Sequence, residues 1–76
     1  MRDITDNLNV MERTVYLYLR NCGGEIDAET LWLELKKRGE ILSIGSVYLK
    51  LKKLENDGLI IRIHARGRKF VYKCKI

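Results

Sequence analysis

The sequence predicts an α+β domain in which three helices precede a two-stranded β-hairpin. Three stretches before Gly58 repeat apolar side chains at helical spacing, and each follows a residue type that commonly caps helices. The last stretch, LIIRIHARGRKFVYKCKI, is rich in β-branched and aromatic residues and alternates after its glycine-containing turn. The 76 residues are enough for one domain with a thin core.

Each expected helix has one apolar face that we assign to the core. The expected helices cover about residues 10–21, 28–38 and 43–57, and their N-caps are Asn9, Asp27 and Ser43. The core-facing residues are Met11, Val15, Tyr18, Leu19 and Cys22 in the first helix, Ala28, Leu31, Trp32 and Leu35 in the second, and Ile44, Val47, Leu51 and Leu54 in the third. The residues of the first helix expected on the opposite face are Glu12, Arg13, Tyr16 and Arg20.

Short connections join these helices. The sequence GEI leaves room only for a strand stub before the second helix. In the link EILS, either Ile41 or Leu42 is expected to enter the core between the second and third helices. Residues 1–8 are polar with scattered acids and are expected to form a short arm, so the domain itself covers residues 9–76.

The charge balance favours an anionic partner. Lys and Arg number 15 against 10 Asp and Glu, a formal net charge of +5, and such an excess in a small domain indicates nucleic acid first. No apolar run approaches the ~20 residues that a membrane span needs, and MRDITDNLNV lacks the apolar segment of a secretory signal. We therefore expect a cytoplasmic protein, in a prokaryotic cell or a virus-infected host cell, without membrane contact.

Residue types that carry metal or catalytic chemistry are sparse. Cys22, Cys74 and His64 do not have the spacing of a zinc site, so no metal or other cofactor is expected. The cysteines are expected to be small, partly buried thiols, with a disulfide between them left open. No carboxylate pair, nucleophile–base pair or Gly-rich phosphate loop is visible, so we expect no enzyme, and no small-molecule effector is evident.

The expected order of elements is that of a helix-turn-helix followed by a wing, because the link between the second and third helices is short. Within it, SIGSVYLKLKKLENDGLI resembles the recognition-helix region of winged helix-turn-helix repressors. The PadR group is the most similar and the ferric uptake regulator group is second. The residues that carry the resemblance are a small residue, an aliphatic and a Tyr, then a Leu and an LE..GL ending: Ser46, Val47, Tyr48, Leu51, Leu54, Glu55, Gly58 and Leu59.

The resemblance covers about residues 15–76 and implies the DNA-reading part of these families. Two family features have no counterpart in the sequence. PadR-like proteins carry a further helix after the wing for dimerisation, and ferric uptake regulators carry a second domain with metal ligands. The resemblance therefore does not extend to oligomeric or effector behaviour.

The third expected helix has a second face of polar and basic residues. Small and basic residues near a helix start suit entry into the major groove, and serine hydroxyls suit phosphate oxygens. The lysines suit phosphates or guanine edges, and the resemblance implies that Tyr48 hydrogen-bonds a phosphate. Lys52 is expected only to be solvated, because it points back toward the second helix. The candidate DNA-binding residues of this helix are Ser43, Ser46, Tyr48, Leu49, Lys50 and Lys53.

The hairpin turn supplies a second basic cluster. Arg66, Arg68 and Lys69 fall within four positions at its tip, and Arg62 and His64 lead into it. An arginine-rich tip fits a minor groove or the backbone beside it. We expect this tip and the third helix to form one continuous cationic surface shaped for duplex DNA.

Together these features predict a sequence-specific double-stranded DNA-binding regulator of transcription that represses by occupying a promoter. Each cluster also has a plainer explanation: a solvated helix face for the lysines, a half-buried position for Tyr48, and a soluble turn for the hairpin tip. A protein-interaction module is one alternative, although Leu49 is the only bulky apolar residue on the expected reading face. RNA binding and replication-linked DNA binding are others.

A homodimer is expected through the first helix and the arm, involving Leu8, Met11, Tyr16 and Leu17. Tyr16 and Leu17 are expected to point away from the core, and exposed apolar surface on so small a domain suits a partner subunit. A two-fold dimer would place two reading helices and two wings on a pseudo-palindromic site. Alternatively, Tyr16 and Leu17 cover the sheet or the arm.

Overall fold

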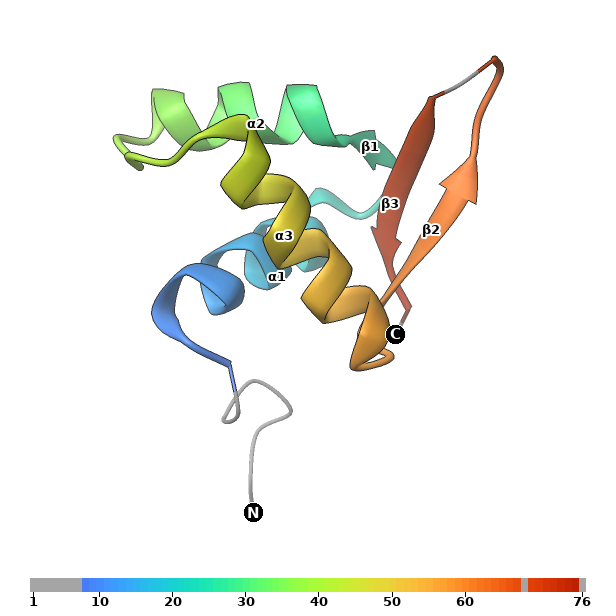
Figure 1. Cartoon of the computed structure of the whole chain (residues 1–76), viewed down its shortest axis with the longest axis horizontal. Helices are drawn as coiled ribbons and strands as arrows, with labels where there is room; N and C mark the ends of the chain where they lie inside the picture. Colours follow the sequence, from blue (N-terminus) through green and yellow to red (C-terminus); the bar gives the residue numbers. More distant parts are fainter. Residues whose placement is uncertain (1–7, 68, 76) are drawn as a thin grey trace.

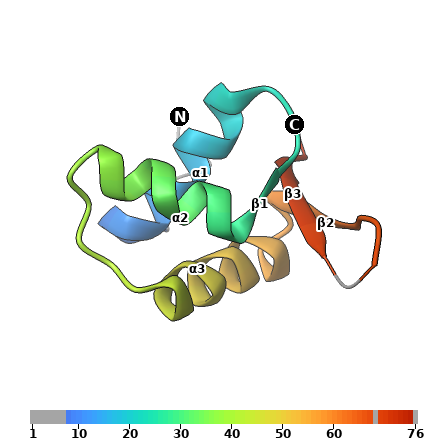
Figure 2. The same ribbon diagram turned by 90° about the horizontal axis from the view of Figure 1, so that it is seen from above.

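The structure, a computed structural model, describes residues 8–67 and 69–75. Its elements are α1 (Val10–Cys22), β1 (Ile26–Asp27), α2 (Ala28–Lys37), α3 (Ile44–Asn56), β2 (Ile60–His64) and β3 (Phe70–Cys74). They form an α+β domain of three helices and a three-stranded antiparallel sheet. The helices lie on one side of the sheet, and the β2–β3 hairpin projects beyond them (Figures 1 and 2). None of the helices in this described part is long and apolar enough to cross a bilayer.

Side-chain caps fix the start of each helix, as the sequence predicts. Asn9 and Glu12 form a capping box at α1: the Asn9 side chain accepts from the Glu12 N–H at 2.8 Å, and the Glu12 carboxylate accepts from the Asn9 N–H at 3.1 Å. Asp27 and Ser43 each accept from the backbone N–H three residues ahead, at 3.2 and 3.1 Å. The helix ends lie within one residue of the expected positions.

The sheet has a third strand, β1, at the place where the sequence leaves room only for a strand stub. β1 pairs with β3 and places Ile26 opposite Tyr72, while β2 pairs with the other edge of β3, so the strand order is β1-β3-β2. The expectation of a two-stranded wing is therefore wrong in strand number. β1 has only two residues and its partner is distant in sequence, so no alternation signals it.

α1 is buried on a wider face than its apolar spacing indicates. Val15 and Leu19 lie in the core as expected, but Tyr16 is only 1% exposed and Glu12 only 9% exposed. Their assignment to an outward face is wrong because α1 contacts both α3 and β3. The contact with β3 reaches Tyr16, whose hydroxyl accepts a hydrogen bond from the Cys74 thiol at 3.6 Å. Glu12 is fixed at the core edge by the capping box.

The structure tests two further expectations, for the link between α2 and α3 and for Cys22. In the link between α2 and α3, Leu42 packs against the core and its carbonyl accepts from Trp32 Nε1 at 2.8 Å, whereas Ile41 is 98% exposed. Trp32 is partly buried, at the edge of the core. Cys22 is exposed, which corrects its assignment to the core face, and no disulfide joins it to Cys74.

Candidate nucleic-acid interface

α3 presents one side to solvent because the other side anchors it in the core. Val47, Leu51 and Leu54 are fully buried. On the far side, Tyr48 is 48% exposed and Leu49 is 67% exposed. The expectation that these two side chains face solvent is therefore confirmed.

One edge of this exposed side borders the hairpin. Tyr48, Lys52 and Glu55 follow each other at spacings of four and three, so they share this edge. Glu55 Oε2 lies 3.5 Å from Nε of Arg62 on β2, and Tyr48 lines a groove together with Phe70 of β3. The edge next to the hairpin therefore carries an aromatic, a lysine and an acid.

The other edge of α3 borders α1. Ser46, Lys50 and Lys53 lie there, as their common spacing predicts, and the first two are half-buried. The Lys53 ammonium forms an ion pair with Asp57. The hydrogen bond that Lys53 donates to Asp57, with smaller contributions from the charges of Asp57 and of Glu12 on α1, raises the pKa of Lys53 above its ordinary value. The serine and lysine face therefore lies on the edge away from the hairpin.

Lys52 was expected only to be solvated, and it is exposed. It shares the edge of α3 that carries Tyr48, which borders both the hairpin and the start of α2. Its spacing of four from Tyr48 was the available signal, since residues four apart share a helix face. Ser43 is exposed and its side chain is engaged as the α3 N-cap.

The tip of the hairpin is a tight basic turn. Arg66 and Lys69 are exposed, while Arg68 lies outside the described residues. The Ala65 N–H donates to the Lys69 carbonyl at 2.9 Å, and Gly67 takes the left-handed conformation, with φ 71°. The turn therefore holds two described cations in solvent at the end of the hairpin.

Phe70 is the centre of an aromatic and basic cluster on the hairpin. It is 40% exposed and pairs across the strands with His64, with ring centroids 5.2 Å apart. The Arg62 guanidinium lies over the Phe70 ring at 4.6 Å and also contacts Glu55. Arg62 therefore links the hairpin to α3. From the sequence, Arg62 was expected only to lead into the basic turn, and Phe70 was not a candidate, because their contact depends on how the strands pair.

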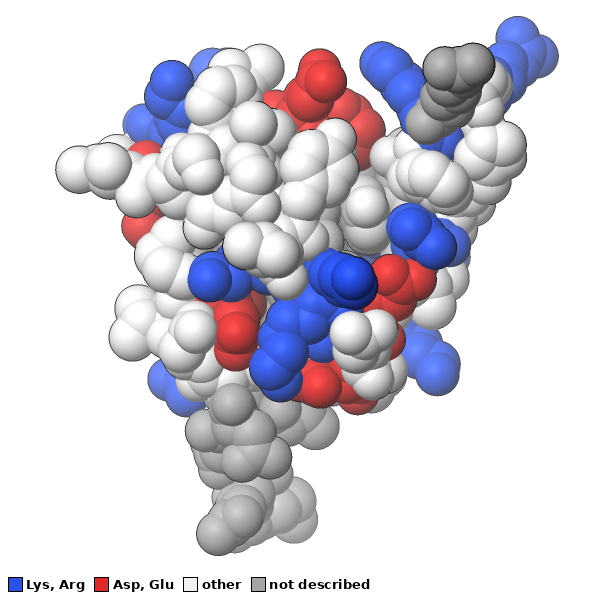
Figure 3. All heavy atoms as spheres, in the orientation of Figure 1, with Lys and Arg blue, Asp and Glu red and all other residues white. Residues whose placement is uncertain are grey.

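The cations do not form the one continuous surface expected from the sequence. In Figure 3, Lys and Arg side chains lie over the C-terminal half of α3 and on the hairpin, with uncharged surface over the start of α3. Asp and Glu side chains lie among them, including between α2 and the hairpin. The expectation is wrong because the lysine face of α3 and the hairpin lie on opposite edges of the helix.

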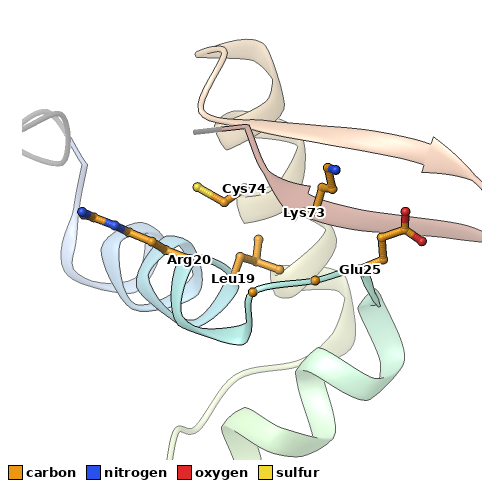
Figure 4. Close-up of a pocket in the computed structure, with 7 residues that line it drawn as sticks. Leu19, Arg20, Glu25, Lys73 and Cys74 are labelled. Atoms are coloured by element: carbon orange, nitrogen blue, oxygen red, sulfur yellow. The ribbon is translucent and has the colours of Figure 1, made fainter.

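A larger hollow lies away from α3. It has a volume of about 470 Å³ and is lined by the end of α1, the following loop and the end of β3. In Figure 4 the Arg20 side chain extends away from Glu25 and Lys73. The charged groups that line the hollow therefore do not converge on one ligand position.

Two of the four residues expected at a dimer interface are buried within one chain. Leu8 is 7% exposed and Tyr16 is 1% exposed, so neither offers apolar surface to a partner. Tyr16 covers the sheet, which is the alternative left open by the sequence. Leu17 remains 38% exposed, and Met11 is half-buried.

Two comparisons with known proteins identify no relative of the chain. No protein-family model matches the chain, and a search of curated proteins finds no significant similarity. Among the described residues, no group of three or more His, Cys, Asp and Glu side chains is placed to hold a metal ion. The candidate interface therefore rests on its own geometry.

Proposed function

We propose that this protein is a winged helix-turn-helix regulator that binds double-stranded DNA and represses transcription by occupying a promoter. In this proposal α3 enters the major groove, and the β2–β3 hairpin lies on the neighbouring backbone or in the minor groove. One observation carries the proposal: the exposed side of α3 borders a basic hairpin, and the Glu55–Arg62 contact joins the two. The net charge of +5 supports it.

Near the start of α3, the exposed side of the helix allows a partner surface to come close to the backbone. Gly45 is exposed there, and a Cβ at this position would meet only the Ser43 Oγ, at 3.9 Å. The fold therefore has room for a side chain, although glycine weakens a helix. A glycine beside Tyr48 and Leu49 suits a partner surface that comes near the helix backbone.

The contacts divide into two kinds. Lys52, Arg66 and Lys69 are exposed cations suited to phosphates, which position a protein without reading sequence. Tyr48 and Leu49 are the side chains placed to meet base edges or the thymine methyl group. Lys53 is a weaker candidate because its ammonium is already paired with an acid.

A protein adaptor is the second candidate function. The acids interspersed with the cations in Figure 3 favour it, as does the 67% exposure of Leu49. An adaptor would bind a stoichiometric protein partner through α3 and would not retard duplex DNA.

Retardation of duplex DNA tests the proposal. If about four phosphates are neutralised, the logarithm of the binding constant should fall with the logarithm of salt concentration at a slope of about −3.6. The double variant Lys52→Glu, Lys69→Glu should lower this slope to about −1.8, because two phosphate contacts are lost. Lys37→Glu with Lys75→Glu makes the same change in net charge at exposed positions outside the candidate interface. If both double variants bind DNA equally, the proposed interface is wrong.

A further inference from the structure

A groove between α3 and the hairpin differs in chemistry from the rest of the candidate interface. Its volume is about 180 Å³. Tyr48 lines it from α3 and Phe70 from β3, and these aromatic side chains are 48% and 40% exposed. Asp27 and Glu29 line it at the start of α2, and Lys69 lines it from the hairpin. Tyr72 of β3, which is buried, completes the aromatic lining. The groove thus combines three aromatic side chains, two carboxylates and one ammonium group.

The carboxylates exclude a phosphate as the group that enters this groove. Asp27 and Glu29 carry negative charge, and one lysine leaves the lining groups with a net negative formal charge. Asp27 is already engaged, since the Thr30 hydroxyl donates to its carboxylate at 2.6 Å. Glu29 is exposed, so its carboxylate is the acceptor available to a ligand. A group that suits the groove is therefore flat, can stack on an aromatic ring, and carries a hydrogen-bond donor.

The surroundings of the groove decide between a nucleobase and a cationic side chain. Aromatic and acidic groups would bind either one. Lys52 lies one helical turn from Tyr48 on the same edge of α3, and Lys69 and Arg66 lie at the hairpin end. These cations repel a basic peptide, whereas they attract the phosphates on either side of a nucleotide. The observations therefore favour a nucleobase.

We propose that this groove holds one unpaired nucleobase with an exocyclic amino group, which leaves the base stack of the DNA bound by α3 and the hairpin. The proposal rests on the proposed DNA-binding function. The base stacks on Tyr48 or Phe70, and its amino group donates a hydrogen bond to the Glu29 carboxylate. Thymine presents a carbonyl oxygen in place of the cytosine amino group, so it meets Glu29 unfavourably. The protein accordingly prefers DNA with an unpaired cytosine, adenine or guanine, each of which carries an exocyclic amino group, to a fully paired duplex.

Fluorescence anisotropy with three versions of one labelled duplex tests this inference. One version is fully paired, one has a single bulged dC, and one has a single bulged dT at the same place. The dC bulge should bind about tenfold more tightly than the dT bulge, which is the scale of one stacked and hydrogen-bonded base. Glu29→Ala should abolish this ratio. Glu25→Ala removes an equivalent exposed glutamate outside the groove and should leave the ratio unchanged.

Two variants of Phe70 distinguish a loss of base stacking from a loss of folding. Phe70→Ser should weaken binding of the dC bulge to the level of the paired duplex, and Phe70→Tyr should restore it, because tyrosine keeps the ring. Circular dichroism establishes that each variant is folded. Loss of binding in both variants, with the fold intact, would contradict the stacking role.

The outcomes distinguish this inference from the proposed function. Equal binding of all three DNAs overturns the groove inference and leaves duplex binding in place. Binding of the bulged DNAs without the paired duplex supports the groove and overturns the proposed duplex reader. Absence of binding to any DNA overturns both. Binding of an oligo-arginine peptide that depends on Glu29, without a dC preference, replaces the nucleobase with a basic protein partner.

Discussion

Gly45→Ala should stabilise the fold and weaken DNA binding in the same molecule. Gly45 lies in the first turn of α3 and is exposed. Its φ is not positive, so alanine fits the backbone without strain. The only neighbour of an added Cβ within 4 Å would be the Ser43 Oγ at 3.9 Å, which is ordinary van der Waals contact.

The two effects have opposite signs and separate causes. Replacing a helical glycine with alanine gains about 0.5–1 kcal/mol of folding free energy. In a domain of this size that gain corresponds to a rise in Tm of about 2–8 °C. A methyl group inserted into a close protein–DNA contact costs about 1–3 kcal/mol, so affinity should fall at least about fivefold.

Scanning calorimetry and anisotropy titration of the same preparations measure both quantities. Gly24→Ala is a matched control, because Gly24 has no positive φ, has open space for a Cβ, and lines the hollow away from α3. It should leave DNA affinity unchanged. A stabilised Gly45→Ala protein with unchanged affinity would refute the close approach of DNA to α3, and a lower Tm would refute the packing argument.

Three further predictions concern single positions. Lys52→Gln should weaken DNA binding more than Lys53→Gln, because Lys53 is already paired with an acid; anisotropy titrations at one salt concentration measure this, and the reverse order would contradict it. The hydrogen bond from Thr30 is the main cause that lowers the pKa of Asp27 below 3.8. Because this pKa is lower in the folded state than in the unfolded state, the charged Asp27 cap stabilises the fold above that pH. The stabilisation is lost as the pH falls through the folded-state pKa. Acid unfolding followed by circular dichroism should therefore show a steeper loss of stability below 3.8 for the wild type than for Asp27→Asn. Leu17→Glu should convert a dimer to a monomer in sedimentation velocity if α1 forms the interface, and a monomeric wild type would remove the dimer hypothesis.

The local features of the fold were predictable because their signals lie within a few residues. Asn9, Asp27 and Ser43 cap the helices as expected, since each cap bonds a backbone N–H only three residues away. The exposure of Tyr48 and Leu49 followed from the buried spacing of α3.

Features that depend on contacts between distant segments were not predictable. Tyr16 is buried because β3 packs on α1, and its hydroxyl meets Cys74, which lies 58 positions further along the chain. The hairpin lies beside α3, where Arg62 contacts Glu55, and this contact joins residues of two different elements. Helical spacing alone groups the lysines of α3 but does not say which edge the hairpin borders. For this reason Lys52 was missed.

Chemical-shift mapping of the labelled protein with duplex DNA tests the central proposal most directly. The largest amide shifts should fall on residues 45–52 of α3 and on the described hairpin residues 62–67 and 69–70. Residues 19–24, which include the end of α1, should be unaffected. Shifts concentrated on residues 19–24 and 73–74, or no shifts at a molar excess of duplex, would contradict the account.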